Sequence, residues 1–147
     1  MKAVSKPWGK EIWLANNELY SLKYIFCFNR VWSSGGLYHL HREKDETFVA
    51  FNGVLVLDVE GEAEELQRMA TRRIFPGMPH RFRSRDHTCS FLEVATHCDD
   101  DDVVRGTLEE LFGMLGDVSN YQSTNESLPG GDVSNYQSTN DFLSSED

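Results

Sequence analysis

Three histidines and one glutamate in the middle of the chain have the spacing of metal ligands. His39 and His41 are separated by one residue, so in a β-strand, where successive side chains alternate between faces, both imidazoles lie on one face. Glu46 begins the next apolar run, and His80 follows a turn sequence at 76–79. Imidazole nitrogens and one carboxylate oxygen suit Zn, Fe, Mn or Ni. The sequence therefore predicts one divalent transition-metal ion bound by His39, His41, Glu46 and His80.

The elements that must position these ligands are short strands. From Trp13 to about Thr96, runs of β-branched and aromatic residues alternate with turn signals at the close spacing of an all-β sandwich or barrel. The predicted strands include Tyr20–Phe28, Thr47–Phe51, Val54–Val59, Arg73–Phe75 and Ser90–Ala95. At 147 residues the chain is long enough for one domain with a core, and we expect a single all-β domain over residues 1–106.

Turn signals separate these runs. Asn52-Gly53 lies between two apolar runs and predicts a type I′ hairpin turn, because both central residues of that turn need positive φ. Glu60-Gly61 and Pro76-Gly77 predict further turns.

After the strands, the sequence predicts a short amphipathic helix over residues 107–115. Thr107 and Glu110 have the spacing of a capping box. The apolar residues that follow recur with helical period, namely Leu108, Leu111, Phe112 and Leu115.

Residues 116–147 form a low-complexity acidic tail with an internal duplication. The segments 116–130 and 131–145 begin with the same ten residues, GDVSNYQSTN. This polar composition predicts a flexible tail. The alternative is that each copy is a docking peptide, or an arm that pairs with a neighbouring subunit.

Charge and composition exclude some classes of partner. The net charge of −10 argues against nucleic acid, which needs a basic surface. No segment approaches the ~20 apolar residues of a membrane span. The three cysteines are odd in number and widely spaced, and the first ten residues lack the apolar run of a signal peptide. We therefore expect a cytoplasmic protein that binds a small molecule.

Two motifs resemble those of the cupin superfamily. The pattern Gly36, His39, His41, Glu46 and Gly53 is similar to the first cupin motif, and the segment Pro76–His80 is similar to the core of the second. The resemblance implies a double-stranded β-helix, or jelly-roll barrel, with a three-His, one-Glu metal centre. It also implies a homodimer.

Further segments narrow the resemblance. Lys6–Glu11, Lys23, Glu93-Val94 and Asp99–Arg105 are similar in order and spacing to the cupin domain of mannose-6-phosphate isomerases, especially the module fused to mannose-1-phosphate guanylyltransferases. This implies a sugar or sugar-phosphate isomerase whose metal holds and polarises the substrate oxygens. Members of that group often have Gln where His39 stands. After the position of Arg105 they usually continue with an Asp and a Tyr-Gly-Arg segment, whereas this chain has Gly-Thr-Leu-Glu-Glu at 106–110. The resemblance therefore leaves substrate recognition open.

Isomerisation also needs a base, and the candidates are Lys23, Glu93 and a metal-bound hydroxide. Lys23 alternates with Ile25 and Cys27, which predicts a side chain facing the barrel interior, where desolvation would lower its pKa. The alternative is an exposed lysine on an edge strand.

Six arginines lie within residues 68–85, close to His80. In a regular strand, however, Arg81, Arg83 and Arg85 occupy the face opposite His80. We therefore expect them on a solvated face, or paired with the acidic segments Glu62–Glu65 and Asp99–Asp102, rather than around a substrate phosphate. By the same alternation, Tyr38 points away from the ligand face.

Two other functions fit the same ligand set. A cupin of the non-haem metal dioxygenase class uses three histidines and one glutamate as well. A non-catalytic small-molecule-binding module is the third possibility, because a fold does not guarantee an activity.

Overall fold

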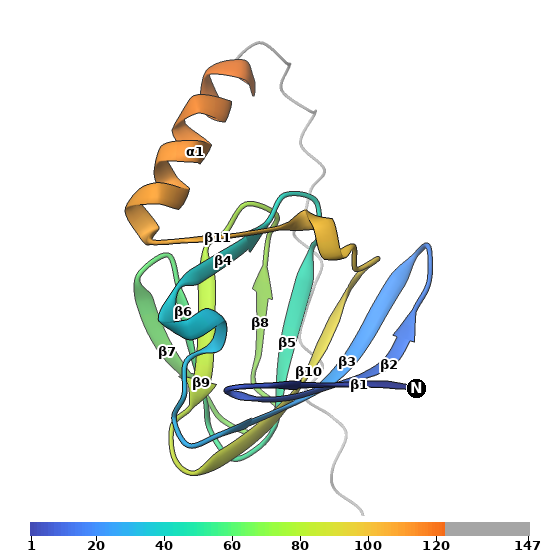
Figure 1. Ribbon diagram of the computed structural model, residues 1–147. Coiled ribbons are helices and arrows are strands. Elements are labelled where there is room, and N and C mark those ends of the chain that lie inside the picture. Colours follow the sequence, from blue (N-terminus) through green and yellow to red (C-terminus); the bar gives the residue numbers. More distant parts are fainter. Residues whose placement is uncertain (123–147) are drawn as a thin grey trace, which may run out of the picture.

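The computed structural model describes residues 1–122 and consists of two antiparallel sheets that pack against each other, with one helix at one end (Figure 1). The six-stranded sheet contains, in spatial order, β1 (Lys2–Lys6), β2 (Gly9–Asn16), β3 (Tyr20–Phe28), β10 (Thr88–Thr96), β5 (Glu46–Asn52) and β8 (Thr71–Ile74). The five-stranded sheet contains β11 (Val103–Gly106), β4 (Tyr38–His41), β9 (His80–Ser84), β6 (Leu55–Val59) and β7 (Glu62–Leu66). Two 3-10 turns are present, η1 (Ser33–Gly36) and η2 (Asp100–Asp102). The predicted all-β class is confirmed.

The core lies between the inner faces of the two sheets. Phe48 on β5, Phe82 on β9 and Phe91 on β10 are almost completely buried, and their ring centroids are 4.8–5.8 Å apart. These tilted and edge-on contacts are favourable for aromatic rings. The ring of His80 lies 5.9 Å from that of Phe48, so the predicted metal ligands border directly on the aromatic core.

The predicted hairpin at Asn52-Gly53 is wrong. Only Gly53 of the pair has positive φ, at 69°, and β5 does not pair with β6, because the chain crosses here from one sheet to the other. A Cβ at Gly53 would lie 2.5 Å from the carbonyl oxygen of Thr88, so close packing also requires glycine there. The two-residue hairpin with positive φ at both positions is Glu60-Gly61, which joins β6 and β7.

The segment Lys6–Glu11 has a structural role in the hairpin of β1 and β2. Trp8 is buried and packs edge-on against Phe82, with ring centroids 5.0 Å apart. Gly9 faces Cys27 on β3, and a Cβ at Gly9 would lie 1.9 Å from the carbonyl oxygen of Phe26. Only glycine lets the two backbones approach this closely.

We therefore predict that Gly9→Ala destabilises the protein, at or above the upper end of the about 1–3 kcal/mol typical of overpacking. Urea unfolding followed by tryptophan fluorescence measures the change. The matched control is Gly113→Ala, because a Cβ at this helical position meets nothing within 4 Å. That change is expected to stabilise the fold by about 0.5–1 kcal/mol. Equal stability of Gly9→Ala and wild type would contradict the packing argument.

Helix α1 (Leu108–Gln122) begins with the predicted capping box. The amide of Thr107 donates to Oε2 of Glu110 at 2.9 Å, and the amide of Glu110 donates to Oγ1 of Thr107 at 3.2 Å. Leu111 is fully buried against Tyr38 and Leu40, on the side of β4 opposite the ligand face. The side chain of Tyr38 therefore points away from the ligand face, as predicted.

The helix ends seven residues beyond the predicted end at 115, inside the first copy of the duplicated segment. The other predictions for the tail, its flexibility and a docking role, concern residues 123–147, which lie outside the described residues. Among residues 1–122, no helix is long and apolar enough to cross a membrane.

Candidate metal centre

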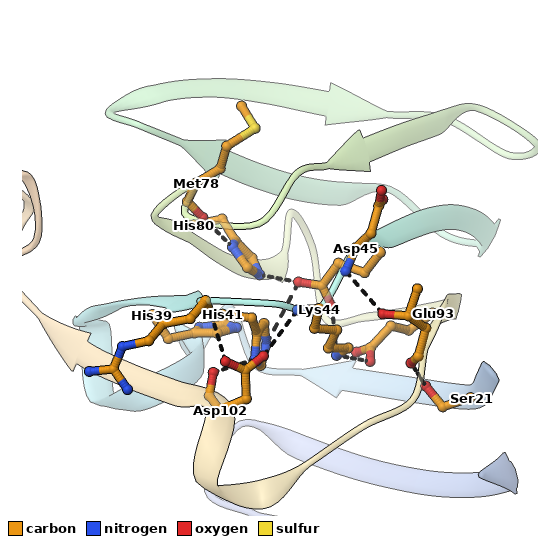
Figure 2. A network of polar contacts seen from close by, with 12 residues as sticks. Ser21, His39, His41, Lys44, Asp45, Met78, His80, Glu93 and Asp102 are labelled. Carbon is orange, nitrogen blue, oxygen red and sulfur yellow. Dashed lines mark hydrogen bonds and ion pairs between the residues drawn. The ribbon is translucent and has the colours of Figure 1, made fainter. Parts of the chain in front are cut away.

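The four predicted ligands come together from three strands, and Figure 2 labels the three histidines among them. His39 and His41 lie on β4, Glu46 begins β5, and His80 begins β9 directly opposite His39. One candidate ligand atom from each residue lies within 4.8 Å of the other three. The spacing of His39 and His41 thus places both imidazoles on the same face of β4, as predicted.

Each imidazole is held by its Nδ1 atom. Nδ1 of His80 lies 2.9 Å from the carbonyl oxygen of Met78, and Nδ1 of His41 lies 3.2 Å from that of Asp102. A carbonyl oxygen only accepts, so Nδ1 carries the proton in both rings and Nε2 keeps a free lone pair. Nδ1 of His39 has a hydroxyl partner, Oγ of Ser34 at 3.4 Å.

Two buried atoms at the centre have no hydrogen-bond partner, namely Oε1 of Glu46 and Nε2 of His80. They are 2.9 Å apart but without hydrogen-bond geometry. An unsatisfied buried polar atom costs about 1–3 kcal/mol. A divalent cation would accept both lone pairs, so the donor set fits a metal ion, as the ligand types predict.

The electrostatic environment keeps these groups in the protonation state that binds metal. Burial lowers the pKa of His39 well below its usual value and also lowers the pKa of His41. Burial alone would raise the pKa of Glu46, but His80, Lys44 and His41 outweigh it and hold that pKa well below its usual range. At neutral pH, His39 and His41 are therefore neutral and Glu46 is ionised, as metal coordination requires.

A buried lysine that sequence reasoning missed completes the centre. Lys44 is 3 % exposed, and its Nζ lies 2.7 Å from Oε2 of Glu46 and 2.5 Å from Oε1 of Glu93. Lys44 lies in the connection between β4 and β5, where a lysine is normally solvated. The sequence could have indicated this role, because Lys44 lies two residues before Glu46, and that spacing puts both side chains on one face of an extended chain.

Lys23 faces the interior, as predicted from its alternation with Ile25. It is 6 % exposed, and its Nζ lies 3.3 Å from Oε1 of Glu93. The predicted lowering of its pKa is wrong. Burial is the largest single influence and acts to lower the pKa, but Glu93 together with the smaller contributions of Cys98 and Glu11 raises the pKa above its usual value. At neutral pH, Lys23 is therefore a charged hydrogen-bond donor and not a base.

A cavity of about 630 Å³ lies beside the ligands. His39 and His41 line it together with Lys23, Lys44 and Glu93. Its remaining charged and aromatic lining residues are Lys2, Lys6, Trp8, Glu11, Trp13, Phe82, Asp99, Asp100 and Arg105. The cavity is thus lined by charged as well as aromatic side chains, and both candidate catalytic residues of the sequence, Lys23 and Glu93, face it.

The arginines near His80 lie outside this cavity, as the alternation along β9 predicts. Arg81 bonds Asp58 at 3.0 Å and stacks on Tyr38. Arg85 pairs with Glu65 at 3.1 Å, which confirms pairing with the first acidic segment. The arginine that does line the cavity is Arg105, which lies outside the cluster 68–85.

The second acidic segment has a different role from the predicted pairing with arginines. Oδ1 of Asp102 accepts from the amide of Arg42 at 2.8 Å, and Oδ2 accepts from the amide of Lys44 at 3.0 Å. The carbonyl oxygen of Asp102 also accepts from Nδ1 of His41. Asp102 therefore holds both His41 and the connection that carries Lys44.

We predict that Asp102→Ala lowers the affinity for Zn²⁺ by about 10–100-fold, because the connection that carries Lys44 loses the carboxylate that accepts from its amides, and the backbone carbonyl that holds His41 is no longer fixed in place. Competition with a chromophoric chelator measures the dissociation constant. The control is Asp101→Ala, since only the backbone amide of Asp101 is used, as a donor to Asp99. An Asp102→Ala protein with wild-type affinity would rule out this supporting role.

No family model and no curated protein matches this chain. Solved structures do. KdgF from Halomonas sp. matches with a TM-score of 0.61 at 13% identity, covering 69% of this chain and 90% of that one. A sugar phosphate isomerase of the cupin superfamily from Silicibacter pomeroyi matches with a TM-score of 0.57 at 18% identity. The match covers 71% of this chain and 85% of that one. An RmlC-like cupin from Shewanella frigidimarina matches with a TM-score of 0.58 at 12% identity. The match covers 68% of this chain and 86% of that one. The fold is therefore the double-stranded β-helix of the cupins.

Proposed function

We propose that this protein is a metal-dependent isomerase of sugars or sugar phosphates, of the mannose-6-phosphate isomerase type. The observation that supports the proposal is the buried Lys23, Glu93 and Lys44 group beside the candidate ligands, in one polar cavity. The resemblance of residues 6–105 points to the same class, and one structural neighbour is described as a sugar phosphate isomerase.

Aldose–ketose interconversion moves one proton from C2 to C1 and a second from the C2 hydroxyl to the C1 oxygen. A bound metal would hold the two substrate oxygens and polarise the carbonyl. Glu93 is the residue of this chain that we assign to carrying the proton between the carbons, because its carboxylate faces the cavity. The ammonium groups of Lys23 and Lys44 donate hydrogen bonds and stabilise negative charge that develops on the substrate oxygens.

The test uses the zinc-, manganese- and iron-loaded protein with a panel of aldose and ketose phosphates and free sugars in deuterated water. NMR is expected to show interconversion with deuterium at C2. Glu93→Gln is expected to keep the metal and lose about 10²–10⁴-fold in turnover. No interconversion of any sugar by the fully metal-loaded protein would refute the proposal.

The same cavity argues against the dioxygenase alternative. A pocket that activates oxygen at iron is drier, whereas this one contains three buried charged side chains, Lys23, Lys44 and Glu93. Oxygen consumption by the iron-loaded protein on organic acids, without any sugar turnover, would favour that alternative. Binding of a sugar without turnover would favour the non-catalytic module.

A further inference from the structure

The two oxygens of Glu46 have different surroundings. Oε2 accepts from Nζ of Lys44 at 2.7 Å, whereas Oε1 is buried, has no hydrogen-bond partner and lies 2.9 Å from Nε2 of His80 and 3.8 Å from Nε2 of His41. One oxygen thus contacts the ammonium group of Lys44, and the other is directed at the histidines.

Lys44 is itself fixed at both ends. Its amide donates to Asp102, and its ammonium group contacts Glu93 as well as Glu46. The side chain is 3 % exposed, so water does not compete for these contacts. Hydrogen bonds between charged groups are the stronger ones in proteins. The orientation of the Glu46 carboxylate therefore depends on Lys44.

We propose that Lys44 is a positioning residue that restricts Glu46 to binding the metal through Oε1 alone. A carboxylate with two free oxygens can bind a cation through both, which would occupy one more coordination position. With Oε2 held by Lys44, that position would remain available for a substrate oxygen. The inference rests on the metal binding of the proposed function, but not on the identity of the substrate.

The test is the visible absorption spectrum of the Co²⁺-loaded full chain, because the spectrum depends on coordination geometry. Lys44→Met is expected to change the Co²⁺ spectrum and to lower the Co²⁺ affinity by about tenfold. A second variant, Lys44→Met with Glu93→Gln, removes one buried negative charge together with the positive charge, so that the summed charge of Lys23, Lys44 and Glu93 is kept, and it is expected to show the same spectral change.

The matched control is Lys23→Met. Lys23 is also buried and also contacts Oε1 of Glu93, but it makes no contact with Glu46. Its removal is therefore expected to leave the Co²⁺ spectrum unchanged. Wild-type spectra in both Lys44 variants would overturn the inference while leaving the proposed function intact. Wild-type protein that binds no Co²⁺ would instead contradict the metal site itself.

Discussion

His41→Ala and Glu46→Ala are each expected to remove the metal ion from the purified protein, to less than about a tenth of the wild-type content. A divalent ion held by imidazole and carboxylate groups loses much of its affinity when one ligand is removed, because no nearby group replaces it. Among the described residues, no further His, Cys, Asp or Glu belongs to this cluster, and the neighbouring Lys44 is cationic and cannot bind a metal ion. Elemental analysis after metal-supplemented expression measures the content, and wild type is expected to contain close to one ion per chain.

The control for metal content is His87→Ala. His87 is exposed and lies outside the four-residue cluster, so its removal should leave the content unchanged. Wild-type protein that holds no transition metal after such expression would contradict the assignment of the site. Loss of metal in His87→Ala as well would indicate unfolding rather than ligand removal.

Glu93→Leu is expected to destabilise the fold by about 3–5 kcal/mol, the usual effect of removing one partner from a buried ion pair. Glu93 is 5% exposed, and its Oε1 is shared by the ammonium groups of Lys23 and Lys44. Without this carboxylate, two buried positive charges repel each other, and only Lys44 keeps a counter-charge, on Glu46. Denaturant unfolding measures the change.

The pH dependence of that loss has a definite sign. In wild type the pKa of Lys23 is raised, so its stabilising contribution is present below the unfolded pKa of 10.5 and is lost as pH rises through the folded pKa. In Glu93→Leu, burial and Lys44 are expected to lower that pKa instead. The variant should therefore gain stability as pH rises toward the unfolded pKa of 10.5, because the buried lysine releases its proton before the unfolded one does.

An exposed ion pair provides the comparison. Glu65→Ala removes the partner of Arg85, but both side chains are about half exposed, and the expected cost is below about 1 kcal/mol. A loss for Glu93→Leu as small as that for Glu65→Ala would show that the buried group does not hold the barrel together. Stability of Glu93→Leu that falls with rising pH would contradict the assigned charges.

Local rules were sufficient where a feature depends on residues close in sequence. The alternation of faces in a strand puts His39 and His41 together, and the spacing of Thr107 and Glu110 gives the capping box. Alternation also placed Tyr38 outside the ligand face and Lys23 inside the barrel. Each of these needs only the repeat of one strand or one helical turn.

The same rules failed where the structure at a position depends on a segment that is distant in sequence. Asn52-Gly53 has the local preference for a hairpin turn, but β5 pairs with β8 and β10, and the chain crosses between sheets at Gly53. Lys23 was expected to lose its charge on burial, but Glu93, which is seventy residues away in sequence and directly opposite on β10, keeps it protonated. Pairing and charge compensation are set by tertiary contacts, and local preference does not encode them.

The sequence by itself therefore determined the all-β fold, the four candidate ligands and the residue types that suit a divalent metal. Only the tertiary structure decided what surrounds them. It brings Asp102 to the connection after β4 and Glu93 to Lys44, and it leaves Oε1 of Glu46 as the oxygen directed at the histidines. Ligand identity follows from side-chain chemistry and strand periodicity, whereas the supporting contacts join residues 49 to 61 positions apart, whose approach depends on the packing of the whole barrel.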